Sequence, residues 1–261
     1  MKILVTFALE NEFAPWRKMH KFHPGKWGDA DVEITKMGGA EVGVLLTGVG
    51  PKQARLETSK VAWTDTGVVE ICIAAGLAGA LRPEYRVGEV LVARTVESDT
   101  VREGATFKVM QSTRSLISMA AECGATVVGR FHTSERVVVR SEDKQRLGAA
   151  ADAVEMESFD TIFSVGSAGC VFAVAVRAVS DVVDEDLPLN LNEVFTDEGR
   201  LSVPRVLGQL AHHPQAIPGL VKLREQGKRA AESLATFLER YILFMIGRMD
   251  QLAAKLSVAT R

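Results

Sequence analysis

The chain has 261 residues, 47% of them hydrophobic and 25% charged, and a formal net charge of -2. A chain of this length and apolar content can bury a sizeable core, which excludes a mainly disordered protein. Its 31 Lys and Arg residues nearly balance its 33 Asp and Glu residues, and only 6% of the residues are aromatic. This composition argues against a nucleic-acid binder, which usually has a basic excess and aromatic stacking platforms.

The three cysteines, Cys72, Cys123 and Cys170, lie far apart in the sequence, and no CxxC motif or Cys/His pair accompanies them. We therefore expect neither a disulfide framework nor a metal site. Residues 1–8 lack the basic and long apolar segments of a signal peptide, and no apolar run reaches transmembrane length. These features predict a cytoplasmic protein.

Short apolar runs rich in β-branched residues predict strands that are covered on both faces of a sheet. The predicted strands are Lys2–Phe7, Val42–Thr47, Val68–Ala74, Glu89–Ala93, Arg136–Val139 and Val171–Ala178. Val32–Lys36 is predicted to form a hairpin with Val42–Thr47 around the Gly38–Gly39 pair. Because Val68–Ala74 and Glu89–Ala93 are joined without room for a helix, we expect a mixed, twisted sheet rather than a regular βαβ alternation.

Helical patterns lie between several of the predicted strands. They cover Pro51–Thr64, Thr113–Cys123, Glu142–Ala149 and Met156–Ser167. Strands that alternate with helices predict an α/β fold, here in three layers with helices on both sides of a central sheet.

The C-terminal part has a different composition. Asp181–Arg200 is polar and acidic and is predicted to be an irregular loop, followed by helices at Pro204–His212 and from Pro218 to near Ser257. The second helix carries an apolar stripe from Leu220 to Met245 among many basic residues. Packing of this stripe on the same domain is the simplest interpretation, and a partner surface or a membrane contact is left open.

Two carboxylates, Glu10 and Glu12, directly follow the first predicted strand, at the end of the sheet where ligands bind in open α/β folds. They are equally the acids expected in an ordinary first helical turn. Glycine-rich turns at Gly48–Gly50 and Gly76–Ala80 follow two further strands and would let backbone N–H groups approach a sugar or phosphate. Neither matches the P-loop or the dinucleotide fingerprint, so each alone is also an ordinary packing turn.

Two further groups of charged residues adjoin apolar segments. Glu155 and Glu157 flank Met156, where a strand is expected to meet a helix. A carboxylate in apolar surroundings needs a partner, and a vicinal diol is suitable because one carboxylate accepts both hydroxyl hydrogens. Arg177 and Asp181 lie at the end of the most apolar predicted strand, where an acid can serve proton transfer. The structural alternative for Glu155 and Glu157 is that they are ordinary acids at a helix N-terminus. The structural alternative for Asp181 is an Asx-turn that closes the strand.

Together, the order and spacing of these segments resemble the nucleoside phosphorylase and nucleosidase superfamily, above all its methylthioadenosine/S-adenosylhomocysteine nucleosidases. The strongest matches are Val154–Glu157 and Arg177–Asp181, supported by Lys2–Phe13 and Gly76–Leu81. The resemblance covers residues 1–185. It implies a partly barrel-like sheet flanked by helices, and cleavage of the N-glycosidic bond of a purine nucleoside, such as an adenine nucleoside.

The resemblance also implies a role for each matching residue. Asp181 would protonate or hydrogen-bond N7 of the leaving base, Glu12 would activate water, and Arg177 would lie near that water. Glu157 would bind the ribose hydroxyls. The other expected substrate contacts are Met156 on the sugar, Glu155 behind Glu157 as a supporting or ligand group, the backbone of Ala78 and Gly79, the backbone of Val138 at adenine, and Ser180.

The choice of nucleophile depends on Glu12. A carboxylate there repels phosphate but can take a proton from water, which favours hydrolysis. Leu77 stands where the nucleosidases have a serine, and Val137 stands where they have an aromatic residue on adenine. These departures leave open a phosphorylase, with Arg17 or Arg55 as the positive charge, and a non-catalytic nucleoside-binding protein.

The C-terminal segments Asp197–Arg200, Val203–Leu207 and His213–Pro218 resemble the hopanoid-associated phosphorylases, which are thought to release adenine from an adenosyl-lipid precursor. We expect one domain over residues 1–261, with a catalytic core at 1–185 and an acidic loop and helical extension at 186–261. The resemblance implies a homodimer and no cofactor, apart from phosphate as the co-substrate of a phosphorylase. The 5′ substituent of the nucleoside is left open.

Overall fold

The structure is a computed structural model that describes residues 1–61, 69–99, 108–170 and 172–259. Its strands are β1 (Lys2–Phe7), β2 (His23–Trp27), β3 (Ala30–Met37), β4 (Ala40–Leu46), β5 (Ile71–Ala80), β6 (Val90–Ser98), β7 (Val109–Gln111), β8 (Thr126–Thr133), β9 (Ala153–Glu155) and β10 (Phe172–Asp181). Its α-helices are α1 (Glu10–Arg17), α2 (Pro51–Val61), α3 (Arg114–Glu122), α4 (Ser141–Leu147), α5 (Ser158–Ser167), α6 (Val203–His212) and α7 (Ile217–Ala259). Short 3-10 turns lie at Leu191–Glu193 and Pro214–Ala216.

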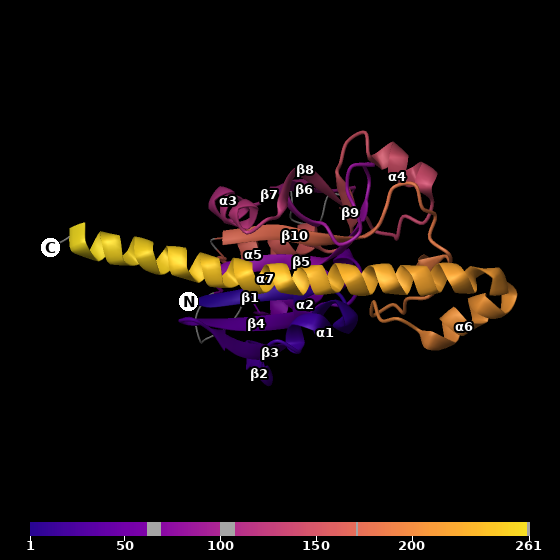
Figure 1. The fold of residues 1–261 in the computed structure, drawn as a ribbon. Helices are drawn as coiled ribbons and strands as arrows, with labels where there is room; N and C mark the ends of the chain where they lie inside the picture. The colour runs from indigo at the N-terminus through magenta and orange to yellow at the C-terminus, as the bar shows by residue number, and fades with distance from the viewer. Residues whose placement is uncertain (62–68, 100–107, 171, 260–261) are drawn as a thin grey trace.

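All strands in the described residues belong to one mixed sheet, in the order β10-β6-β8-β9-β5-β1-β4-β3-β2, with β7 beside β6. Strand β5 also pairs with β10, so β10, β6, β8, β9 and β5 close into a ring. Strands β1, β4, β3 and β2 extend from this ring as an open sheet (Figure 1). The pairs β1–β5 and β5–β10 are parallel, whereas β3–β4 and β6–β10 are antiparallel. The expected mixed, partly barrel-like sheet is therefore confirmed.

Helices cover both faces of this sheet. One apolar cluster joins α1, α3 and α7 to β1, β4, β5 and β10, with Phe13, Leu116 and Tyr241 buried in it. A second cluster packs Phe159 of α5 against the closed part of the sheet, and a third joins Val61 of α2 and Val165 of α5 to β1. The expected three-layer arrangement is confirmed by these clusters.

Helix α7 runs across one face of the sheet and continues past its edge, as Figure 1 shows. The later part of its apolar stripe, from Ala230 to Met245, is buried against the sheet, whereas Leu220 and Leu223 near its start are half-buried. The interpretation that the stripe packs on the same chain is confirmed for this buried part. Within the described residues, no helix is long and apolar enough to cross a membrane.

Two sequence predictions are wrong. Arg136–Val139 is not a strand, because its backbone bonds to the Asn192 side chain and to Leu187 instead of to a neighbouring strand; the strand of this region is β8. Gly76–Ala80 is not a turn after a strand but the second half of β5, which stays paired with β10 as far as Gly79. Four strands are not predicted: β2 is mostly polar, β7 and β9 have only three residues each, and Gly129 and Arg130 interrupt the apolar run of β8.

The remaining predicted elements are found with shifted ends. The hairpin around Gly38–Gly39 is β3 and β4, with Lys36 opposite Glu41. Residues 62–64 of the first predicted helix, Val68 and Val171 lie outside the described residues. The acidic segment Asp181–Arg200 is largely irregular, as expected, although Asp181 is the last residue of β10.

Candidate active site

Glu12 lies in the first turn of α1, directly beyond the carboxyl end of β1. Its Oε2 accepts hydrogen bonds from the backbone N–H groups of Ala8 (2.9 Å) and Leu9 (3.1 Å), so the side chain folds back over the start of its own helix. Its Oε1 accepts a hydrogen bond from the N–H of Leu77 on β5 (3.2 Å). Burial raises the pKa of Glu12, while Arg177 and these N–H donors oppose the rise. The carboxyl is thus held at the junction of β1 and β5.

Arg177 on β10 is almost fully buried, with 1% of its surface exposed. Its Nη1 donates to the carbonyl oxygen of Ala75 (3.0 Å), and its Nε and Nη2 donate to the hydroxyl of Ser158 (3.2 and 2.9 Å). Nη2 also donates to Glu155 and Glu157. The guanidinium therefore holds two carboxylates in place from inside the protein.

Gly76 makes room for this guanidinium. Its backbone has a φ of +154°, and a Cβ at this position would lie 1.9 Å from Nη1 of Arg177. A side chain would thus be excluded by sterics as well as by backbone conformation. This explains why a glycine lies in the middle of β5.

Glu155 is the last residue of β9, and Glu157 directly precedes the first residue of α5. Oε2 of Glu155 accepts hydrogen bonds from the backbone N–H groups of Glu157 (2.9 Å) and Ser158 (2.7 Å), and Oε1 accepts one from the Thr133 hydroxyl. With the Arg177 contact, both oxygens of Glu155 are engaged within the protein. The protein itself thus holds this carboxylate, and the role expected for Glu155 stays a prediction.

Glu157 is bound less completely. Its Oε1 accepts a hydrogen bond from the N–H of Gly50 (2.9 Å), and its Oε2 lies 3.4 Å from Nη2 of Arg177. Burial, together with the charges of Glu155 and Glu12, raises the pKa of Glu157 to about 8 against the opposing effect of Arg177. Beside it, the methyl group of Met156 would lie 3.9 Å from a Cβ at Gly50. Glu12, Glu155, Glu157 and Arg177 thus form one buried group, called here the carboxylate cluster.

Asp181 is the last residue of β10 and lies at the same edge of the sheet as the carboxylate cluster. Its Oδ2 accepts a hydrogen bond from Nζ of Lys144 on α4 (2.5 Å), and its Oδ1 accepts one from the Ser180 hydroxyl (2.7 Å). That hydroxyl also lies 3.2 Å from the carbonyl oxygen of Ala78. A Cβ at Gly79 would lie 2.9 Å from Oδ2, so the absence of a side chain there leaves space for the carboxylate.

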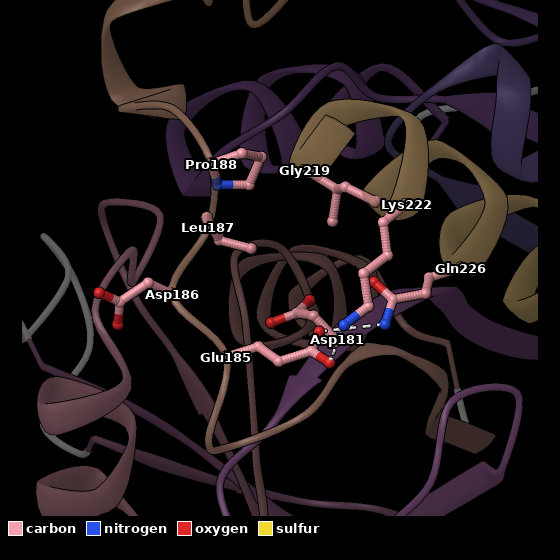
Figure 2. A pocket seen from close by; sticks show the side chains of 9 residues that line it. Asp181, Glu185, Asp186, Leu187, Pro188, Gly219, Lys222 and Gln226 are labelled. Carbon is pink, nitrogen blue, oxygen red and sulfur yellow. Dashed lines mark hydrogen bonds and ion pairs between the residues drawn. The ribbon is translucent and has the colours of Figure 1, made fainter. Parts of the chain in front are cut away.

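Asp181 also borders a cavity of about 260 Å³ between the segment after β10 and the first turns of α7. Figure 2 shows Lys222 and Gln226 of α7 reaching across to Glu185, with Asp181 beside them. The Lys222–Glu185 distance is 2.6 Å and the Gln226–Glu185 distance is 3.0 Å. Asp181 thus lines a cavity that is partly open to solvent.

Val138 lies half-buried between β8 and α4. Its neighbours are anchored: the N–H of Val137 donates to Asn192 (2.7 Å), whose amide donates back to Val137 (3.0 Å), and the N–H of Leu187 donates to the carbonyl of Val139 (2.8 Å). In the described part of the chain, no hydrogen bond uses the N–H or C=O of Val138 itself. Its backbone is therefore available to the polar edge of a ligand.

Arg17, one of the two arginines considered from the sequence as a positive charge for phosphate, does not belong to the carboxylate cluster. It forms ion pairs with Glu10 (2.9 Å) and Glu33 (3.6 Å). Leu77 gives only its N–H to Glu12, and its side chain faces α7 at Gly227. Among residues 1–61, 69–99, 108–170 and 172–259, no group of three or more His, Cys, Asp or Glu side chains could hold a metal ion.

Several residues of the site were not found from the sequence. Lys144 lies in the charged run Ser141–Leu147, which is typical of an exposed helix, although the residue is fully buried. Thr133 and Ser158 carry no local signal that would pair them with Glu155 and Arg177. A lysine is almost never fully buried without a partner, but sequence alone does not reveal burial.

Comparisons with solved structures return the same fold. Methylthioadenosine/S-adenosylhomocysteine nucleosidase of Helicobacter pylori, bound to butyl-thio-DADMe-Immucillin-A, matches with a TM-score of 0.71 and 19% identity, over 93% of this chain and 97% of that one. Futalosine hydrolase of Helicobacter pylori matches with a TM-score of 0.70 and 18% identity, over 93% and 97%. The Neisseria meningitidis nucleosidase, bound to methylthio-immucillin-A, matches with a TM-score of 0.69 and 20% identity, over 93% and 98%.

A comparison with models of protein families matches residues 2–211 to the Phosphorylase superfamily. This stretch includes every element from β1 to nearly the end of α6, and therefore both parts of the candidate site. Because the match spans well over half of the 261 residues, the chain belongs to the Phosphorylase superfamily and is an enzyme of that superfamily, as its motifs indicate.

Proposed function

We propose that this protein hydrolyses the N-glycosidic bond of a purine nucleoside. In this proposal Asp181 stabilises the departing base, Glu157 binds the ribose hydroxyls, and Glu12 takes a proton from the attacking water. The observation that carries the proposal is the carboxylate cluster, in which three buried carboxyl groups surround the single guanidinium of Arg177.

The charge of this cluster suits one type of transition state. Cleavage of the bond leaves positive charge on the ribosyl group, and preorganised negative groups stabilise developing positive charge. The same cluster disfavours phosphate, because like charges close together in a dry site repel strongly. Arg177 does not offset this repulsion, since its donors are used by Ala75, Ser158 and the carboxylates. Water is therefore the better nucleophile.

The proposed general base, Glu12, and the proposed acid, Asp181, adjoin different residues of β5. Glu12 bonds to the N–H of Leu77, and Asp181 adjoins Gly79, two residues further along the strand. Two residues of a strand span roughly 7 Å, which leaves space for a sugar and a water molecule between the two groups. Enzymes that cleave glycosidic bonds by direct attack of water keep their two carboxyl groups similarly far apart.

The substrate class follows from the available contacts and from the structural relatives. The unpaired backbone groups of Val138 suit the edge of adenine, which presents one donor and one acceptor. The solved structures with this fold include methylthioadenosine/S-adenosylhomocysteine nucleosidases and a futalosine hydrolase. We therefore propose an adenine nucleoside with an altered 5′ substituent as the substrate.

The test is to incubate the protein with methylthioadenosine and with adenosine, in buffers with and without phosphate. We expect adenine together with free ribose or methylthioribose, at rates that do not depend on phosphate. Strict dependence on phosphate, with a sugar 1-phosphate as product, would show a phosphorylase instead. Binding of the nucleosides without any turnover would show a non-catalytic binding protein.

Two carboxylates in the same helical turn provide a matched pair of variants. Glu12→Gln should lower turnover by about 10²–10⁴-fold, the usual contribution of a general base. Glu10→Gln should leave turnover unchanged, because Glu10 is half-exposed and pairs with Arg17. Equal effects of the two variants would contradict the role of Glu12.

A further inference from the structure

Lys144 of α4 is a fully buried lysine, with 0% of its surface exposed. Burying an ammonium group is costly, so such a lysine requires close polar partners. Its Nζ donates to Oδ2 of Asp181 (2.5 Å) and to the carbonyl oxygens of Val182 (3.0 Å) and Glu185 (2.9 Å). All three hydrogens of the ammonium are thus directed at the end of β10 and the segment that follows it.

These contacts position the side chain of Asp181 more than they stabilise the fold. A buried ion pair adds little stability compared with apolar residues of the same volume, so its presence beside a functional group calls for another reason. The Asp181 carboxylate has one oxygen bound by Lys144 and the other by the Ser180 hydroxyl, which fixes its plane. The bonds to Val182 and Glu185 also hold the segment that borders the cavity.

We propose that Lys144 is the positioning residue of the acid: it orients Asp181 and supplies, through Asp181, the proton that the departing base receives. This inference rests on the proposed function. Nζ of Lys144 first passes a proton to Oδ2 of Asp181, which leaves a neutral carboxylic acid beside a neutral amine. As the bond between the sugar and N9 breaks, its electron pair moves to the purine, N7 takes that proton from Asp181, and the carboxylate is restored. The lysine, left as a neutral amine, is reprotonated from solvent after the base leaves.

The chemistry explains why a lysine suits this position. An ammonium that is hydrogen-bonded to a carboxylate can pass a proton to it, and the 2.5 Å contact between Nζ of Lys144 and Oδ2 of Asp181 provides that path. An arginine would keep its proton, because a guanidinium does not deprotonate in proteins. Lys144 therefore differs from Arg177, whose guanidinium keeps its proton and can only hold its carboxyl partners in place.

The test compares two substrates whose leaving groups differ in their need for a proton. An adenine nucleoside needs protonation of its base, whereas p-nitrophenyl β-D-riboside releases an anion that is stable without it. For Lys144→Met we expect kcat to fall by about 10²–10⁴-fold on the nucleoside, as for loss of an acid, and by only a few-fold on the nitrophenyl riboside. Lys144→Arg should show the same contrast.

The controls separate the possible failures. Arg146→Met changes an exposed cation of the same helix and should alter neither rate. Equal losses on both substrates, or no loss on either, would overturn the inference, and full recovery of nucleoside turnover by Lys144→Arg would overturn the proton supply. If the unmodified protein cleaves neither substrate, the proposed function fails. Calorimetric binding of adenine then decides the inference: Lys144→Met should weaken binding at least tenfold, and unchanged binding would refute it.

Discussion

Glu157→Gln offers a direct test of the electrostatics of the carboxylate cluster, because it removes one titrating group and almost no volume. The native carboxyl holds its proton up to about pH 8, whereas the unfolded chain loses it near 4.5. Between these values the native state binds more protons than the unfolded state. The free energy of unfolding of the unmodified protein therefore falls as pH rises through this window.

The size of this effect follows from the linkage between protons and stability. One proton bound only in the native state changes the free energy of unfolding by about 1.4 kcal/mol per pH unit. Between pH 5 and pH 7 the contribution of Glu157 is therefore up to about 2.7 kcal/mol. Glutamine does not titrate, so the variant lacks this loss and should gain up to that amount relative to the unmodified protein as pH rises.

The assay is urea denaturation of both proteins at several pH values between 5 and 8, followed by circular dichroism. The difference in the free energy of unfolding between Glu157→Gln and the unmodified protein should grow steadily with pH. Glu225→Gln on the exposed surface of α7 is the matched control and should give a constant difference. Parallel stability curves for Glu157→Gln would refute the reasoning, because they would mean that Glu157 is ionised in the native state throughout.

Three further predictions follow from the same contacts. Gly76→Ala, with its Cβ 1.9 Å from Nη1 of Arg177, should abolish cooperative unfolding in urea, whereas Gly39→Ala, with nothing within 4 Å, should unfold normally. Arg177→Met leaves buried carboxylates without their cation and should cost roughly 3–5 kcal/mol in urea denaturation; a loss near zero would show that the cluster needs no cation. Asp181→Asn should lower kcat about 10²–10⁴-fold with an unchanged circular dichroism spectrum, and near-full activity would remove Asp181 from the mechanism.

The local patterns predicted the class of fold because hydrophobic periodicity depends only on neighbouring residues. The runs Lys2–Phe7 and Val42–Thr47 became strands β1 and β4, and the part of the predicted stripe from Ala230 to Met245 became the buried face of α7. Arg136–Val139 has the same apolar and β-branched character, yet it is not a strand. Nothing within those residues indicates that Asn192, far along the chain, takes the hydrogen bonds that a neighbouring strand would provide.

The sequence by itself determined which residue types could carry chemistry, since motifs around Glu12, Glu157 and Asp181 are contiguous and resemble a known superfamily. Only the tertiary structure decided how these groups are charged and paired. Burial and long-range contacts engage both oxygens of Glu155, direct the Arg177 guanidinium toward the buried carboxyl groups, and bring Lys144 from a helix rich in charged residues to Asp181. Burial and pairing across the sheet depend on residues that are distant in sequence, so they cannot be predicted from local sequence patterns, although they decide how these groups are charged.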